Sequence, residues 1–424
     1  MNVCLIHPPH ENSTDDRLDP PLGLLYLATH LREANIDVSL ADLSGMKQKD
    51  WKIPYADIYG ITVYITSIKV TKEIIAQCKK INPKAIIVVG GAHPSARPND
   101  FDFVDYVVVG PGEVAIVDIA LGVVKEHIVI GKEPKNYFPF PAYDLIDINS
   151  YHRTIGKNRS LPYLTSRYCP YKCAFCGLST MHKLGSGVKV ASAETVKIHL
   201  EIIKNVLKVD SVAFQDDIFT MHKKRLYSIL ETTKEHSIRF RCMGRAGLDD
   251  EMTYKKLAES GCEQLSWGIE SGSQYMLDRM NKQVKVKDNY NVIQWAKKYG
   301  ITTRAFFIIG FPGETEQTIR ETKQFIIDAD PDQYFASNFV PYPGTDCGDN
   351  PSKYGITQVS EDFNNYYQVN KEGKGGITID TEWLSRTEFR ALELDFRNWL
   401  NNRPFRGNVQ KYEAKIRNKN DTIR

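Results

Sequence analysis

No apolar run in this sequence approaches the ~20 residues that a membrane-spanning helix requires. The sequence also lacks a marked excess of positive or negative charge. The 55 Lys and Arg stand against 52 Asp and Glu, a net charge of +3, so nothing indicates a general attraction to nucleic acid or to an anionic membrane. A strand-like run at residues 2–6 leaves no room for a targeting segment before it. We therefore expect a cytoplasmic globular protein, and 424 residues predict two domains with an appendage.

The sequence also lacks the two separate Cys-x2-Cys pairs of a zinc ribbon. Zinc ribbons need two such pairs, and here five cysteines stand alone: Cys4, Cys78, Cys242, Cys262 and Cys347. Disulfides are not expected in a reducing compartment. The other three cysteines form one C-x3-C-x2-C segment, Cys169, Cys173 and Cys176. Three thiolates on one loop can hold three irons of a [4Fe-4S] cluster and leave the fourth iron open to a substrate or cofactor; zinc is the main alternative.

The first 130 residues alternate strand-like and helical runs. Strands are predicted at residues 2–6, 37–40, 58–64, 85–89 and 106–109, with a helical leucine face between the first two. The alternation predicts a doubly wound, Rossmann-like α/β domain over residues 1–130. Glycines at 90–91, 110 and 112 follow two of the strands. Ligands of such folds bind at that edge, although isolated glycines also serve to make turns.

Residues 131–157 are rich in proline and aromatic residues, which predicts an ordered linker, since flexible linkers are rich in Gly and Ser. Over residues 158–345 the alternation runs six times, with strands predicted at 161–166, 212–215, 238–243, 264–268, 303–309 and 334–340. Six repeats predict a partial (β/α)6 barrel, with its active site at the carboxyl ends of the strands. Residues 346–424 predict a small, mostly helical region with one helix at 382–400 and a basic, solvated tail.

Every unusual motif follows one of the six predicted strands, so the motifs should share one rim. The cysteines follow the first strand, Asp216 and Asp217 the second, and Arg245 the third. Glu270 follows the fourth, Gly-Phe-Pro-Gly-Glu at 310–314 the fifth, and Pro-Tyr-Pro-Gly-Thr at 341–345 the sixth. This rim is the predicted active site.

On these motifs the chain resembles the radical S-adenosylmethionine (SAM) superfamily. The resemblance rests on three motifs: C-x3-C-x2-C with Phe175 before its last cysteine, Gly-Ile-Glu-Ser-Gly-Ser at 268–273 and Phe-Ile-Ile-Gly-Phe-Pro-Gly-Glu-Thr at 307–315. Gly-Gly-Ala-His-Pro at 90–94, Gly-Pro-Gly-Glu at 110–113 and Phe-Pro-Phe-Pro-Ala-Tyr-Asp-Leu at 138–145 are similar to the subgroup with a cobalamin-binding domain.

Two departures from the family pattern stand out. Gln215-Asp216-Asp217 replaces the family's Gly-Gly-Glu after the second barrel strand. The first strand of the chain is not followed by Asp-x-His-x-x-Gly, the motif that supplies a histidine to cobalt in several cobalamin proteins. Either cobalamin binds without that histidine or the domain has lost the cofactor; His7 and His10 are candidate substitute ligands, with surface positions as the alternative.

The resemblance implies that an electron donor such as flavodoxin or ferredoxin reduces the cluster, which then cleaves SAM to methionine and a 5′-deoxyadenosyl radical. With cobalamin as methyl carrier, the implied reaction is methylation of an unactivated carbon or phosphorus centre of a small molecule or peptide. Two alternatives are open: a radical cyclisation, rearrangement or oxidation with cobalamin idle or absent, and a non-catalytic metal-binding scaffold.

The resemblance also implies roles for single residues. Phe175 belongs to the SAM site, Asp216 or Asp217 accepts from the SAM ammonium, Arg245 meets its carboxylate, Glu270 accepts from its ribose, and Gly310 lets adenine lie against the backbone. Tyr171 and Lys172 shield the cluster. Cobalamin would contact Thr62, Ser67, Gly90, Gly91, Gly110, Gly112 and Glu113. Tyr342, Tyr366 and Tyr367 are candidates for the substrate site, with packing as the alternative.

Overall fold

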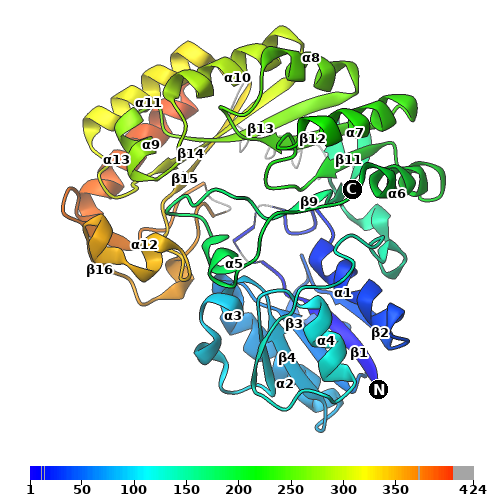
Figure 1. The fold of residues 1–424 in the computed structure, drawn as a ribbon. Coiled ribbons are helices and arrows are strands. Elements are labelled where there is room, and N and C mark those ends of the chain that lie inside the picture. Colours follow the sequence, from blue (N-terminus) through cyan, green and yellow to red (C-terminus); the bar gives the residue numbers. More distant parts are fainter. Residues whose placement is uncertain (11, 14, 371–372, 404–424) are drawn as a thin grey trace.

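The computed structural model describes residues 1–10, 12–13, 15–370 and 373–403 of the chain. The basic end of the sequence, predicted as a solvated tail, lies outside these described residues. Figure 1 shows a twisted sheet formed by the N-terminal part and a strongly curved sheet formed by the middle of the chain, with α5 (Ser179–Lys183) between them.

Within the described residues, the N-terminal sheet has six parallel strands in the order β2-β1-β3-β4-β5-β6. They are β1 Asn2–His7, β2 Asp37–Asp42, β3 Ile58–Thr62, β4 Ile86–Gly90, β5 Tyr106–Val109 and β6 Ile128–Ile130. The helices are α1 Leu22–Glu33, α2 Ile68–Ile81, α3 Ala92–Ala96 and α4 Glu113–Ala120. Inner strands are apolar throughout because hydrophobic cores cover both faces of the sheet. The strand order reverses between β1 and β3, where ligands of such sheets bind.

The curved sheet has the order β15-β14-β13-β12-β11-β8-β7 in the part of the chain that is described. Its parallel strands are β8 Asn158–Tyr163, β11 Ser211–Phe214, β12 Arg239–Gly244, β13 Cys262–Glu270, β14 Thr302–Ile309 and β15 Gln333–Asn338; β7 (Thr154–Ile155) pairs antiparallel with β8. The helices along its outer side in Figure 1 include α6 Ala193–Asn205, α7 Lys223–Glu235, α8 Glu251–Glu259, α10 Val286–Lys298 and α11 Glu316–Ala329. The short β9 (Ser166–Arg167) and β10 (Lys189–Val190) pair with each other, and α9 spans Gln274–Arg279.

The segment between the two sheets is ordered by the burial of its aromatic side chains. Phe138 and Tyr143 are buried, and the Tyr143 hydroxyl donates to the carbonyl of Pro162 in β8. Short 3-10 turns at Tyr143–Leu145 and Ile148–Ser150 carry the chain to β7.

The C-terminal region covers the last strands of the curved sheet. It contains α12 (Asp346–Asp349), an antiparallel pair formed by β16 (Ile356–Val359) and β17 (Ile379–Thr381), and α13 (Arg386–Asn401). A capping box starts α13, because Ser385 and Glu388 exchange hydrogen bonds between side chain and backbone. Its apolar face, including Phe389 and Phe396, joins the core of the curved sheet.

The predicted fold class is confirmed. A Rossmann-like sheet precedes a six-stranded partial barrel, and a long helix ends the described chain. Six short strands of the described residues were not predicted as separate elements, namely β6, β7, β9, β10, β16 and β17, because two to four residues are too short to carry a recognisable period in the sequence.

Candidate active site and cofactor cavity

The cysteine segment forms the loop between β9 and α5, at the carboxyl end of the first barrel strand. Its thiols are free, and the loop is half-buried at Cys169 and Cys176 and buried at Cys173. Two backbone hydrogen bonds fix the loop to the barrel and to the C-terminal region: Ala174 N–H donates to the Met280 carbonyl at 2.9 Å, and the Ala174 carbonyl accepts from Cys347 N–H in α12 at 3.1 Å. The loop is therefore held at its middle, between the second and third cysteines.

The chemistry of the three thiols fits a [4Fe-4S] cluster. Each iron takes one thiolate, so the sulfurs must surround a cluster and need not converge on a single ion. No group of three or more His, Cys, Asp or Glu side chains gathers around a single metal position in the described ranges. A cubane bound by Cys169, Cys173 and Cys176 would leave one iron for SAM.

Arg245 lies directly against the cysteine loop. Its guanidinium stacks on the ring of Tyr171 at 3.6 Å, and its Nη1 lies 3.9 Å from Cys173 Sγ. The Nη2 atom donates to the backbone carbonyl of Lys282. Arg245 is thus packed against the loop that would bind the cluster, between Tyr171 and the barrel, while the sequence interpretation assigned it to the SAM carboxylate.

The two adjacent aspartates have different environments. Asp216 is fully buried and accepts from Thr165 N–H at 2.7 Å, Thr165 Oγ1 at 2.5 Å and Ser166 Oγ at 2.6 Å. Its hydrogen-bonding capacity is therefore used to fix the turn that leads into the cysteine loop. Asp217 is exposed just beyond the carboxyl end of β11, where surrounding protein and the charge of Asp216 raise its pKa to about 6. Of the pair, Asp217 keeps a carboxylate available for the SAM ammonium.

Glu270 forms a buried ion pair that the sequence did not indicate. Its Oε1 lies 2.7 Å from Lys282 Nζ, and Lys282 also stands 5.9 Å from the ring centre of Phe175. Glu270 adopts a left-handed backbone conformation (φ 64°) at a bulge in β13. A Cβ at Gly268 would lie 2.2 Å from Glu270 Oε1, so this glycine provides room for the pair. Because the Glu270 carboxylate already has a partner, a ribose bound there would share it with Lys282.

Gly310 is covered by the C-terminal helix. The residue has φ 77°, and a Cβ there would lie 2.3 Å from ring atoms of Phe389 in α13. Its N–H donates to Glu314 Oε2 at 3.3 Å. The side of Gly310 on which a side chain would stand therefore packs against an aromatic ring, which accounts for the glycine, and its contact with adenine stays a prediction.

A cavity of about 540 Å³ opens at the carboxyl ends of β1, β3, β4 and β5, at the point where the strand order reverses. Six of the seven residues assigned to cobalamin line it: Thr62, Gly90, Gly91, Gly110, Gly112 and Glu113. The seventh, Ser67, is not among the lining residues; its hydroxyl bonds instead to the backbone N–H and carbonyl of Tyr64. Ser67 thus caps a turn and does not contact the cavity.

The shape of the cavity depends on two glycines, because a side chain at either position would collide with its surroundings. Gly91 has φ 107°, and a Cβ there would lie 2.9 Å from Thr62 Oγ1. Gly110 has φ 87°, and a Cβ there would lie 2.8 Å from Leu184 next to α5. A cradle of this kind at the carboxyl ends of the strands is where ligands of doubly wound sheets bind.

The cysteine loop forms part of the wall of this cavity. Arg167, Tyr168 and Met181 line it from the barrel side. Arg167 forms a buried ion pair with Glu113 at the start of α4, and its guanidinium lies 4.8 Å from the ring centre of Tyr26. The pocket of the N-terminal domain and the predicted cluster site therefore share one segment.

His7 and His10 also line the cavity. Their ring centres lie 5.8 Å apart, and the ring of Tyr64 lies 4.5 Å from His10 and 6.4 Å from His7. Burial lowers the pKa of both imidazoles. The structure thus brings His7, at the end of β1, and His10, on the loop after it, together inside the predicted cofactor pocket.

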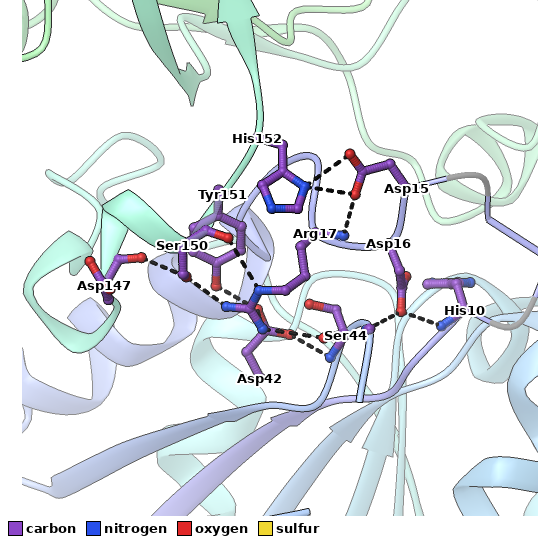
Figure 2. A network of polar contacts seen from close by, with 11 residues as sticks. His10, Asp15, Asp16, Arg17, Asp42, Ser44, Asp147, Ser150, Tyr151 and His152 are labelled. Carbon is purple, nitrogen blue, oxygen red and sulfur yellow. Dashed lines mark hydrogen bonds and ion pairs between the residues drawn. The ribbon is translucent and has the colours of Figure 1, made fainter. Parts of the chain in front are cut away.

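A polar network fastens the loop after β1 to the segment between the domains (Figure 2). Arg17 donates to Ser150 Oγ at 2.7 Å and to the Ser44 carbonyl at 3.2 Å, and its guanidinium lies 4.8 Å from the ring centre of Tyr151. Asp15 pairs with His152 at 3.0 Å. Asp15 also belongs to the cavity lining, so residues 150–153 support one wall of the pocket from outside.

The tyrosines considered for the substrate site pack mainly on one another. Tyr366 is buried, and the Tyr342 hydroxyl donates to its carbonyl at 3.3 Å. Both belong to a small cluster with Ile65 of the N-terminal domain. Tyr367 is half-buried, and its carbonyl accepts from Gly376. These contacts close the seam between the C-terminal region and the first domain.

Comparison with known proteins identifies the class. The profile of the Radical SAM superfamily matches residues 163–326, and that of the B12 binding domain matches residues 19–120. The chain thus contains a radical SAM domain preceded by a B12-binding domain. The radical SAM domain implies a [4Fe-4S] cluster and SAM as cofactors, the B12-binding domain supports cobalamin, and the chain is an enzyme with methyltransferase-named relatives.

Individual relatives are similar over most of their length. An uncharacterized methyltransferase of Pyrococcus horikoshii is 29% identical over 81% of this chain and 82% of its own. The anaerobic magnesium-protoporphyrin IX monomethyl ester cyclase of Rubrivivax gelatinosus is 23% identical over 82% of this chain and 69% of its own. Among solved structures, the radical SAM methyltransferase TsrM from Kitasatospora setae, with tryptophan and a SAM analog bound, superimposes with a TM-score of 0.69 at 17% identity, covering 95% of this chain and 89% of TsrM. This last likeness establishes the fold.

None of the helices in the described ranges combines the length and the apolar character needed to cross a membrane.

Proposed function

We propose that the chain methylates an unactivated carbon centre, using SAM both as the radical source and as the origin of the methyl group carried by cobalamin. The observation that supports this most directly is the shared wall of the two sites. Arg167 and Tyr168 line the cavity of the cobalamin-binding domain and immediately precede Cys169. A methyl carrier and a radical source on two sides of one loop can act on the same substrate atom.

The residues of the chain position and shield the reactants. When bound, the cluster supplies the electron that cleaves SAM, and cobalamin supplies a methyl group. Cys169, Cys173 and Cys176 would hold the cluster, and Asp217 would accept from the SAM ammonium. Arg245 and Tyr171 cover the cysteine loop on the barrel side and would keep water from the cluster.

The substrate is expected to be a small molecule or a peptide that enters at the seam between the domains. A small electron carrier such as flavodoxin or ferredoxin would deliver the electron. A phosphorus centre is chemically possible for the same machinery, but the methylation of carbon is the form that we propose.

The test is anaerobic reconstitution with iron, sulfide and cobalamin, followed by incubation with SAM and a low-potential reductant. The expected products are S-adenosylhomocysteine, from methylation of the corrinoid, together with 5′-deoxyadenosine. The protein should contain about one corrinoid and about four irons per chain. The triple variant Cys169→Ala, Cys173→Ala, Cys176→Ala should lose iron and 5′-deoxyadenosine, while Cys78→Ala, a buried cysteine of the N-terminal core, should retain both.

Radical chemistry without methyl transfer is the second candidate, favoured by the likeness to the ester cyclase of Rubrivivax gelatinosus. It predicts 5′-deoxyadenosine without S-adenosylhomocysteine, whether or not cobalamin is present. If saturating cobalamin leaves no corrinoid on the protein, methyl transfer by this route is ruled out.

A further inference from the structure

Three lysine or arginine side chains are buried among the described residues, and Arg245 differs from the other two. Lys282, which is 8% exposed, lies 2.7 Å from the Glu270 carboxylate. Arg397, which is 9% exposed, lies 2.8 Å from the Glu393 carboxylate. Arg245 is 6% exposed and has no carboxylate within ion-pair distance in the described part of the chain. Because a buried charge without a counter-charge is strongly unfavourable, an anion is needed to complete its surroundings.

The guanidinium of Arg245 is held in a fixed orientation by neutral groups. Arg245 directly follows β12, and its Nη2 donates to the backbone carbonyl of Lys282. One face of the guanidinium lies 3.6 Å from the ring centre of Tyr171, on the cysteine loop. These two contacts aim Nη1 at Cys173, with 3.9 Å between the nitrogen and the sulfur. A permanently charged, planar donor is thus directed at a cysteine thiol.

The missing counter-charge arrives when the cluster is bound. A cysteine binds metal as the thiolate, so Cys173 changes from a neutral thiol into an anionic ligand next to Arg245. The charge of Arg245 also acts on the thiol of Cys169, so two of the three cluster cysteines lie in its field. Net charge and hydrogen bonds to the sulfurs are among the factors that set the reduction potential of an iron–sulfur cluster. A positive charge at this place favours the reduced cluster, which holds one more electron.

We propose that Arg245 is the counter-ion of the cluster, donating to the Cys173 thiolate and raising the reduction potential so that a flavodoxin- or ferredoxin-type carrier can reduce it. The step concerned is the transfer of one electron from the reduced carrier to the oxidised cluster, and no proton or other atom moves with it. This role differs from a contact with the SAM carboxylate, because it is present before SAM binds. The inference rests on the cluster of the proposed function and is independent of cobalamin and of methyl transfer.

The experiment compares the full-length protein, reconstituted anaerobically with iron and sulfide, with its Arg245→Gln and Arg245→Lys variants. The cluster is titrated with reductant in the absence of SAM, and electron paramagnetic resonance measures the reduced fraction at each potential. We expect Arg245→Gln to lower the ratio of reduced to oxidised cluster about tenfold, which shifts the midpoint potential by about 59 mV to more negative values for a one-electron couple. Arg245→Lys keeps the charge and should recover part of this shift.

Arg397→Gln is the matched control. It removes the other buried guanidinium, which already has the Glu393 carboxylate as its partner, so it should lower stability and leave the midpoint potential unchanged. An equal shift in Arg397→Gln overturns the proposal, because the shift would then reflect a general loss of stability. An unchanged potential in Arg245→Gln also overturns it, and weaker SAM binding in that variant would return Arg245 to the SAM carboxylate. If the unsubstituted protein forms no reducible cluster, the proposed function itself is contradicted.

A measurement on the unsubstituted protein covers the case in which Arg245→Gln does not retain iron. The protein is labelled with ¹⁵N only in arginine, and pulsed electron paramagnetic resonance is recorded on the reduced cluster. We expect a ¹⁵N coupling, because the N–H of Arg245 donates to a sulfur that carries part of the unpaired spin, and we expect its loss in Arg245→Lys. The absence of an arginine coupling from the unsubstituted protein overturns the proposal.

Discussion

The carboxylate of Glu113 and the guanidinium of Arg167 form an ion pair across the domain boundary, with 6% and 13% of their side chains exposed. Glu113 begins α4 in the N-terminal sheet, and Arg167 ends β9, two residues before Cys169. The pair therefore couples the wall of the cofactor cavity to the position of the first cluster cysteine.

Arg167→Ala should lower the free energy of unfolding by about 3–5 kcal/mol, because it leaves the Glu113 carboxylate buried without a partner. Cobalamin and iron content should fall together. The exposed pair of Arg32 and Asp144, 2.8 Å apart, is the matched control, and Arg32→Ala should cost less than about 1 kcal/mol. Urea unfolding and cofactor analysis measure both. If the two variants lose the same free energy of unfolding, the Glu113–Arg167 pair contributes no more stability than a surface ion pair.

Asp216 and Asp217 should differ in what their removal affects. Asp216→Ala removes three hydrogen bonds and leaves Thr165 N–H unpaired, so we expect a loss of at least about 2–3 kcal/mol of stability and less iron per chain. Asp217→Asn should change stability by no more than about 0.5 kcal/mol. It should weaken SAM binding by about 10- to 150-fold, the equivalent of about 1.5–3 kcal/mol for a hydrogen bond to a charged group. Calorimetric SAM titration and thermal unfolding of both variants test the contrast; unchanged SAM affinity in Asp217→Asn removes that residue from the site.

Gly310→Ala should destabilise the protein through the C-terminal helix. A left-handed backbone costs a residue with a Cβ about 1–2 kcal/mol, and overpacking against Phe389 adds about 1–3 kcal/mol. The double variant with Phe389→Ala should lose the overpacking part, because the ring is gone. Gly187, with no atom within 4 Å of a built Cβ and no positive φ, serves as control, and Gly187→Ala should be close to neutral. Additive effects of Gly310→Ala and Phe389→Ala in denaturant unfolding would contradict the contact.

Glu314 should make stability depend on pH. Burial, opposed by hydrogen bonds from Thr318 and Gly310 N–H, raises its pKa from 4.5 to about 7. Between these values the folded protein holds a proton that the unfolded chain has lost, so stability is highest below about pH 4.5 and falls as the pH rises through 7. The full span is about 3 kcal/mol. Glu314→Gln has no proton to lose, and the difference between its profile and that of the unsubstituted protein should follow this curve. A difference that is constant between pH 4.5 and 8 would mean that Glu314 titrates normally.

The strands and the rim could be predicted because each depends on local sequence. Short β-branched runs at regular intervals give the strands, and parallel strands necessarily bring their carboxyl ends together. The thiols at 169, 173 and 176 were recognisable because three ligands on one loop need no information from elsewhere in the chain.

The partners of the rim residues were not predictable in the same way. Lys282 reaches Glu270 only because a bulge in β13 turns the carboxylate toward it, and Phe389 covers Gly310 from 79 positions further along the chain. Neighbouring aspartates look alike in sequence, yet the fold buries Asp216 and exposes Asp217. The cavity histidines were visible as residues, but their meeting with Tyr64 in one pocket is a property of the folded chain.

The hydrogen bond between Arg17 and Ser150 has a consequence for how the protein folds during synthesis and for where chimaeric proteins can be joined. During synthesis the N-terminal sheet is complete once β6 has emerged, but its pocket gains outer support only with residues 150–153 and its far wall only with Arg167. An N-terminal domain cut at residue 130 and fused to another enzyme would contain the cavity glycines but would lack residues 150–153 and Arg167, which support the cavity wall. A useful crossover point for building chimaeras lies after Arg167, inside the barrel, rather than between the two domains.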